Sequence, residues 1–142
     1  MTQELYWLTL TAAIALFMPF PYVLERNFRI GWWRGLGYTR SGTAGFEQPD
    51  ETPARWAARA CRAHQNAFTD LATFAILILV AHAAAISDPL VLLGAKIYFF
   101  ARMTHYTSYI LAIPLIRSLA YITAWSGMLL MVFVILRHPV LH

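Results

Sequence analysis

The sequence predicts an all-α integral membrane protein, built as a bundle of four transmembrane helices. Of its 142 residues, 59% are hydrophobic and only 13% are charged, whereas soluble domains carry about 25% charged residues. Four apolar segments, each long enough to cross a bilayer as a helix, follow one another along the chain. The single Cys leaves no room for a disulfide framework or a Cys-based metal site.

One domain over residues 1–142 is expected, with spans at about 5–25, 54–86, 89–113 and 116–136. The first segment has neither a basic n-region nor a small-residue cleavage site, which favours a retained span over a signal peptide. Pro19 and Pro21 fall in its last turns and are expected to kink or end it. The connection at about 26–53 carries five Gly residues and an acidic stretch, which is loop composition.

Proline also marks the turns between the later spans. The Ser-Asp-Pro sequence at 87–89 predicts a tight turn with an N-cap residue and a proline in the first helical turn. Pro114 marks the next break. The third span is the least hydrophobic, because Lys96 and Arg102 interrupt it.

Arginines concentrate around the connection between the first two spans, with none at the N-terminus and one in the tail. Those around the connection are Arg26, Arg29, Arg34, Arg40, Arg55, Arg59 and Arg62. Cytoplasmic loops carry an excess of Lys and Arg, so we expect this loop in the cytoplasm and both termini on the periplasmic side. The net charge of +4 therefore indicates membrane topology, and no nucleic-acid partner is expected.

Three of the predicted helices carry polar stripes at their cytoplasmic ends. The polar residues of each stripe recur at helical spacing, so they share one helix face. In the second span they are Arg55, Arg59, Arg62, Asn66, Thr69 or Asp70, and Thr73. In the third span they are Arg102, His105 and Tyr109, and in the fourth they are Arg117, Ser118 and Tyr121. Ionisable groups at membrane depth cost a few kcal/mol each on insertion scales, so they face a bundle interior or a wet cavity. Cations outnumber acids here, which predicts a carboxylate-bearing ligand from the cytoplasm meeting a lipophilic one from the bilayer.

Other interpretations of these residues stay open. Arginines at helix ends, such as Arg55 and Arg59, can extend to the lipid headgroups. Arg102 or Arg117 could pair with Asp70 as structural links between helices. Tyr109 and Tyr121 could belong to an interfacial aromatic belt. Three further predictions are that His82 is a packed helix–helix contact, that Lys96 extends outward, and that Cys61 is an inert small hydrophobe.

Two segments carry a resemblance to a known family. The stretch RACRAHQN at 59–66 resembles the second-helix R-x-x-R-A-H-x-N motif of the MAPEG family, the membrane-associated proteins in eicosanoid and glutathione metabolism. FARMTHYTSYILAIPLIRSLAY at 100–121 is similar to that family's third- and fourth-helix segment, and PYVLER at 21–26 to its bacterial branch. The resemblance covers nearly the whole chain, and it implies a homotrimer in a bacterial inner membrane.

The resemblance also implies a function and the residues that perform it. It implies a membrane-bound glutathione transferase or peroxidase, acting on lipophilic electrophiles with glutathione as cosubstrate. Its implied glutathione-binding residues are Arg62, Asn66, Arg102, His105, Tyr109, Tyr121 and, from the adjacent subunit, Arg26. Arg117 would stabilise the glutathione thiolate, with Ser118 beside it as a weaker catalytic candidate. No metal is implied.

One departure from the family pattern motivates a second hypothesis. The family's enzymes usually have a Glu three residues after the motif Asn, where this chain has Thr69. Asp70 comes one position later, about 100° further round the helix. The alternative is therefore a non-enzymatic protein on the same fold that binds lipid or a small anion, or acts as a scaffold. A transporter or channel has less support, because the chain shows no inverted repeat and no helix broken at mid-membrane depth.

Overall fold

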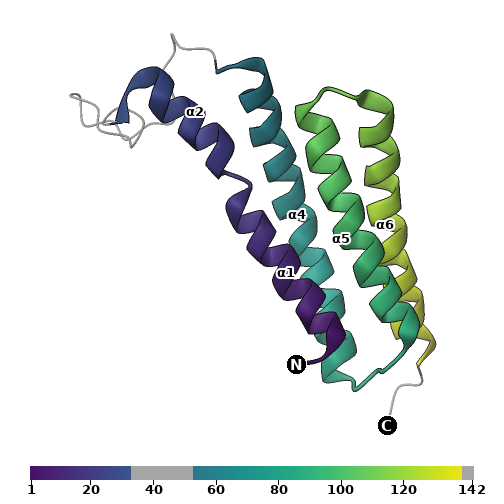
Figure 1. Cartoon of the computed structure of the whole chain (residues 1–142). Coiled ribbons are helices and arrows are strands. Elements are labelled where there is room, and N and C mark those ends of the chain that lie inside the picture. Colours follow the sequence, from purple (N-terminus) through teal and green to yellow (C-terminus); the bar gives the residue numbers. More distant parts are fainter. Residues whose placement is uncertain (33–52, 139–142) are drawn as a thin grey trace.

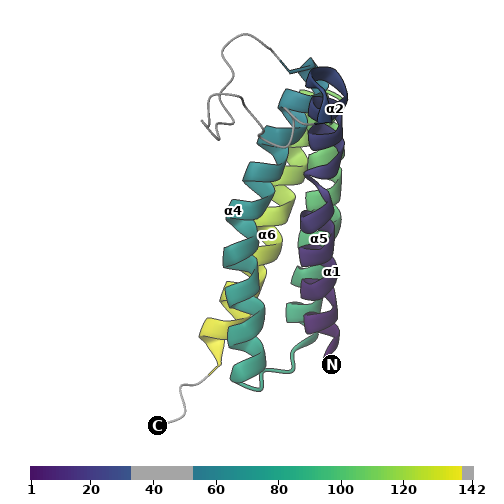
Figure 2. The same cartoon turned by 90° about the vertical axis from the view of Figure 1, so that its left-hand side faces the viewer.

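The computed structural model describes residues 1–32 and 53–138, and these form a bundle of long antiparallel helices (Figure 1). In chain order the helices are α1 (Gln3–Phe17), α2 (Phe20–Ile30), α4 (Arg55–Ala83), α5 (Pro89–Ile110) and α6 (Pro114–Arg137). The start of α1 and the end of α6 lie at one end of the bundle (Figures 1 and 2). The α5–α6 turn lies at the opposite end, together with α2 and the start of α4.

The first span is broken at the prolines. Helix α1 ends at Phe17 and α2 begins at Phe20, as expected where Pro19 and Pro21 each remove a backbone N–H donor. The Tyr106 hydroxyl on α5 donates to the Met18 carbonyl at 2.8 Å. A carbonyl at the break is thus satisfied from a neighbouring helix, as a membrane interior demands.

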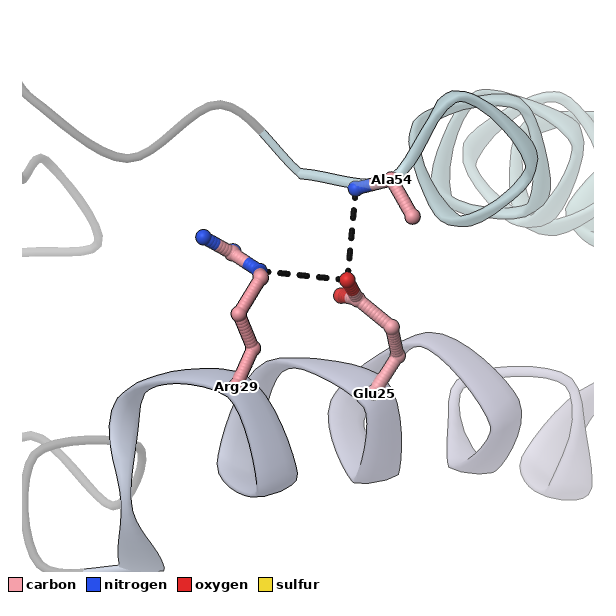
Figure 3. A network of polar contacts seen from close by, with 3 residues as sticks. All are labelled: Glu25, Arg29 and Ala54. Carbon is pink, nitrogen blue, oxygen red and sulfur yellow. Dashed lines mark hydrogen bonds and ion pairs between the residues drawn. The ribbon is translucent and has the colours of Figure 1, made fainter.

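Helix α2 continues beyond the predicted end of the first span. Residues 26–30, which we expected to open the loop, are helical. The Glu25 carboxylate accepts from Arg29 Nε at 3.1 Å and from the Ala54 backbone N–H at 3.2 Å, which ties α2 to the start of α4 (Figure 3). Gly31, at φ +86°, then ends the helix. The rest of the expected loop, residues 33–52, lies outside the described residues.

The later spans begin and end within three residues of the predicted positions. Asp88 caps α5 by accepting from the Leu90 N–H at 2.8 Å, and Pro89 is the first residue of that helix. Helices α4 and α5 both end in a turn whose left-handed residue is alanine, Ala85 at φ +52° and Ala112 at φ +60°. Glycine is the usual residue at that position.

Three stretches of the described residues are long and apolar enough to cross a membrane: Gln3–Arg29, Arg55–Ala83 and Pro114–Arg137. Helix α5 is absent from this set, and it carries Lys96 and Arg102. Its place in the bundle accounts for its polarity, because α5 packs against α1, α4 and α6 and buries polar groups against protein. Many large apolar side chains of the other helices are exposed, as expected for surfaces that face lipid.

Helices α5 and α6 form the most extensive pair, and they approach closely at two glycines. A Cβ atom added at Gly94 would lie 2.7 Å from the Gly127 carbonyl oxygen, and one added at Gly127 would lie 2.8 Å from that of Gly94. Small residues of this kind allow helix backbones to pack tightly in membranes. The pairing holds the polar residues of the two helices in a fixed register.

Candidate functional site

A cleft of about 390 Å³ opens between α4, α5 and α6, near the α5–α6 turn. Its lining residues are Asn66, His105, Tyr109, Arg117, Ser118, Tyr121 and Ile122. The first six were all predicted from the sequence as site residues, and they come from three different helices. The polar stripes therefore converge on one cavity.

Arg117 supplies the formal positive charge of the cleft lining. It lies in the first turn of α6, where its backbone N–H donates to the Ile113 carbonyl at 3.1 Å. Its guanidinium carbon lies 4.8 Å from the centre of the Tyr109 ring, a cation–π distance. Ser118 follows it, with a hydroxyl that donates back to the Pro114 carbonyl at 3.0 Å. Among the described residues, the contact of the Arg117 guanidinium is thus a ring on α5 and not a carboxylate.

Aromatic rings form the wall beside Arg117. The buried His105 ring lies 5.6 Å from Tyr109 and 5.8 Å from Tyr121, measured between ring centres. Trp125, one turn further along α6, lies 6.1 Å from Tyr121. Tyr hydroxyls and imidazole nitrogens can each donate or accept a hydrogen bond, so this wall can orient a polar ligand.

Arg102 lies behind the cleft and does not line it. It is only 2% exposed, and one terminal nitrogen donates to Asp70 Oδ2 at 2.9 Å. Its Nε and second terminal nitrogen have no hydrogen-bond partner among the described residues. Of the two interpretations of Arg102, the structure therefore shows the α4–α5 ion pair. Arg117 makes no such pair with Asp70 in the described part of the chain.

Arg62 and Arg26 also lie away from the cleft within one chain. Arg62 is exposed on α4, one turn before Asn66. Arg26 is half-buried on α2, which packs against α4 on the side away from α5 and α6 (Figure 1). Neither arginine is among the residues that line the cleft of a single chain.

Two residues differ from their sequence-based interpretation. Arg59, expected to extend to the headgroups, donates from Nε to the Ile110 carbonyl at 2.9 Å. His82, expected to be packed between helices, is exposed. Its side chain lines a smaller cleft of about 270 Å³ at the other end of the bundle, beside Glu4 and Ser87. Sequence spacing gave no signal for the Arg59 contact, since its acceptor is a backbone carbonyl.

Cys61 and His64 lie on the α2 side of α4. The Tyr22 hydroxyl lies 3.0 Å from His64 Nδ1, and Cys61 is half-buried beside the same hydroxyl. No group of three or more potential metal ligands occurs within residues 1–32 and 53–138. These contacts link α2 to α4 and are separate from the cleft.

Comparison with known proteins assigns the chain to a family. The MAPEG family model matches residues 5–137, which include every residue of the cleft. The chain belongs to the MAPEG family. No curated protein matches it. Family membership and the membrane-length helices make it an integral membrane protein of a family associated with glutathione and eicosanoid metabolism.

Proposed function

We propose that this MAPEG protein is a membrane-bound glutathione-dependent transferase or peroxidase that acts on lipophilic electrophiles. One observation carries the proposal: six of the nine residues selected from the sequence line a single cleft. The cleft combines one arginine with an imidazole, two phenols and an amide. Such a set suits a ligand with an anionic centre and several amide or carboxylate groups, and glutathione has this chemistry.

Arg117 is proposed to stabilise the glutathione thiolate. A neighbouring cation favours the thiolate over the thiol, and the thiolate is the nucleophile. Once the thiol proton has passed to water, the sulfur lone pair forms a bond to the electrophilic carbon, and the leaving group departs with its bonding pair. With a hydroperoxide, the thiolate sulfur attacks the terminal oxygen, the O–O bond breaks, and the alkoxide leaves with the bonding pair and takes a proton from water to give the alcohol. The sulfur of a second glutathione then attacks the resulting sulfenic acid, whose oxygen leaves as water, and the two sulfurs form the disulfide. Arg117 serves both reactions because both begin from the same anion.

The remaining lining residues are proposed to hold the tripeptide and admit the second substrate. Asn66, His105, Tyr109 and Tyr121 offer hydrogen bonds to its peptide groups and carboxylates. Ser118 is a weaker candidate, because its proton is already donated to a backbone carbonyl. Ile122 is apolar and exposed, so it offers a path from the lipid-facing side of α6.

Assembly as a homotrimer in a bacterial inner membrane, with the cleft facing the cytoplasm, is part of the same proposal. It gives a role to Arg62 and Arg26, which one chain leaves outside the cleft but a neighbouring subunit could bring to it. Light scattering of the detergent-solubilised protein measures the protein mass of the assembly. A mass of one chain, where three are proposed, would remove these two arginines from the ligand site.

Turnover with an aryl halide and with a lipid hydroperoxide tests the proposed activity. We expect glutathione-dependent product with at least one of them, and a loss of 100-fold or more in Arg117→Ala, as is typical when a group that stabilises a developing charge is removed. Arg55→Ala is the matched control, because Arg55 is an exposed arginine near the same end of the bundle. Equal turnover in Arg117→Ala and Arg55→Ala would refute the assigned role.

Binding of an acidic lipid or small anion without catalysis is the second candidate function. It is favoured by the absence of any carboxylate among the described residues that line the cleft. Asp70 is engaged with Arg102, and the Thr69 hydroxyl donates to the Gln65 carbonyl at 3.0 Å. The ammonium group of glutathione therefore has no acidic partner in the lining. A native mass spectrum with one acidic lipid per chain and no thiol ligand would support this candidate.

A further inference from the structure

The carbonyl groups at the end of α5 are all hydrogen-bonded, but one of them depends on a different helix. A helix end leaves its last four carbonyls without partners in the helix. Backbone N–H groups of the following turn satisfy three of them: Leu111 to Thr107 at 3.0 Å, Ala112 to Tyr109 at 3.2 Å, and Ile113 to Ser108 at 2.9 Å. The fourth, on Ile110, accepts from Arg59 Nε of α4 at 2.9 Å.

The turn that Arg59 holds is strained. Ala112 adopts φ +60°, a left-handed conformation in which a Cβ atom crowds the following carbonyl. Such conformations persist only where the surrounding structure fixes them. The Arg59 hydrogen bond is charge-assisted and part-buried, so it is among the stronger single contacts available to this turn.

The same turn lies between Tyr109 and Arg117, the two residues that form the cation–π contact in the cleft. Tyr109 lies in the last turn of α5, and Arg117 lies in the first turn of α6, with the guanidinium 4.8 Å from the Tyr109 ring centre. The backbone N–H of Arg117 also donates to the carbonyl of Ile113, which belongs to the turn itself. A shift of the turn would therefore move the guanidinium relative to the ring.

We propose that Arg59 is a positioning residue for the Tyr109–Arg117 pair: by donating to the Ile110 carbonyl it fixes the α5–α6 turn and so sets where the guanidinium lies in the cleft. This gives a role to the first arginine of the R-x-x-R-A-H-x-N pattern. The consequence for catalysis rests on the proposed function. The claim that Arg59 fixes the position of the guanidinium does not rest on that function, because the Tyr109 ring and the Arg117 guanidinium both belong to this chain.

Fluorine NMR of protein labelled with 3-fluorotyrosine tests the positional claim without glutathione. The chain has seven tyrosines, and the Tyr109 resonance is assigned by its loss in Tyr109→Phe. We expect Arg59→Ala to shift this resonance in the direction seen in Arg117→Ala, because both changes displace the cation from the ring. Arg59→Lys, which keeps a cationic donor, should restore much of the wild-type shift.

Arg55→Ala is the matched control and should leave the Tyr109 resonance unchanged, since Arg55 is exposed one turn away on the same helix. An unchanged resonance in folded Arg59→Ala would overturn the proposal. If Arg59→Ala does not fold, nitrogen-15 NMR of the wild-type arginine Nε–H groups decides the matter. The Arg59 Nε–H should exchange with solvent more slowly than that of Arg55, and equal exchange rates would overturn the proposal.

Turnover gives the functional readout. In Arg59→Ala we expect kcat with glutathione to fall on the order of tenfold or more, with little change in the KM for the electrophile, because small misplacements of a reacting group are costly. If Arg59 only stabilised the fold, Arg59→Ala would instead lower the amount of folded protein and leave kcat unchanged. If the wild-type protein does not use glutathione, the proposed function fails, while the fluorine comparison still decides the role of Arg59.

Discussion

Removing the Asp70 carboxylate should destabilise the bundle strongly. Arg102 is 2% exposed, and its ion pair with Asp70 is the only hydrogen bond of its guanidinium within the described residues. Asp70→Ala therefore leaves a buried cation with no hydrogen-bond acceptor among the described residues and only the Tyr98 ring, 5.9 Å away, beside it. Breaking a buried pair in this way costs about 3–5 kcal/mol, which is roughly a 140- to 3,700-fold change in the unfolding equilibrium constant.

Reversible unfolding in detergent micelles, followed by far-ultraviolet circular dichroism, measures this free energy. The exposed Asp88–Arg137 pair provides the control, and Arg137→Ala should have a far smaller effect because solvent screens that pair. The double variant Asp70→Leu with Arg102→Met removes both charges and should recover most of the loss. The reasoning is refuted if Asp70→Ala loses no more than Arg137→Ala.

Three further predictions follow from the packing and the turns. Gly127→Ala should destabilise the protein by about 1–3 kcal/mol in the same assay, because its Cβ would meet the Gly94 carbonyl, whereas exposed Ser126→Ala should be nearly neutral. Ala85→Gly and Ala112→Gly should each stabilise the fold by up to about 1 kcal/mol by relieving a left-handed alanine; a loss of stability in both would contradict the assigned strain. The Leu90 N–H, and to a smaller extent Arg137, hold the pKa of Asp88 below its ordinary value, so its contribution to stability is present above pH ~4 and is lost as the pH falls through its folded pKa. Thermal unfolding at pH 3 and pH 7 should therefore differ less in Asp88→Asn than in the wild type.

The helices and the break in the first span were predictable because hydropathy and proline act locally. Pro19 and Pro21 remove donors whatever surrounds them, and the apolar runs have no stable alternative to helix in lipid. The extension of α2 was not predictable in this way. There the Glu25 carboxylate accepts a hydrogen bond from the Ala54 N–H, a contact between positions 29 residues apart that local sequence patterns do not reveal.

The cleft was largely predictable because helical spacing places residues on a face regardless of tertiary detail. His105, Tyr109, Arg117 and Tyr121 converge for this reason. Helical spacing could not predict which arginine forms an ion pair inside the bundle. Only the packing of α4 on α5 decides that Asp70 pairs with Arg102.

The proposal that Arg117 holds a glutathione thiolate in the cleft is best tested by an ultraviolet difference spectrum. The purified protein in detergent is titrated with glutathione beside Arg117→Ala and Arg55→Ala. We expect a saturable thiolate absorption band in the wild type and in Arg55→Ala, and its loss in Arg117→Ala. Absence of the band in the wild type at millimolar glutathione, or its persistence in Arg117→Ala, would contradict the claim.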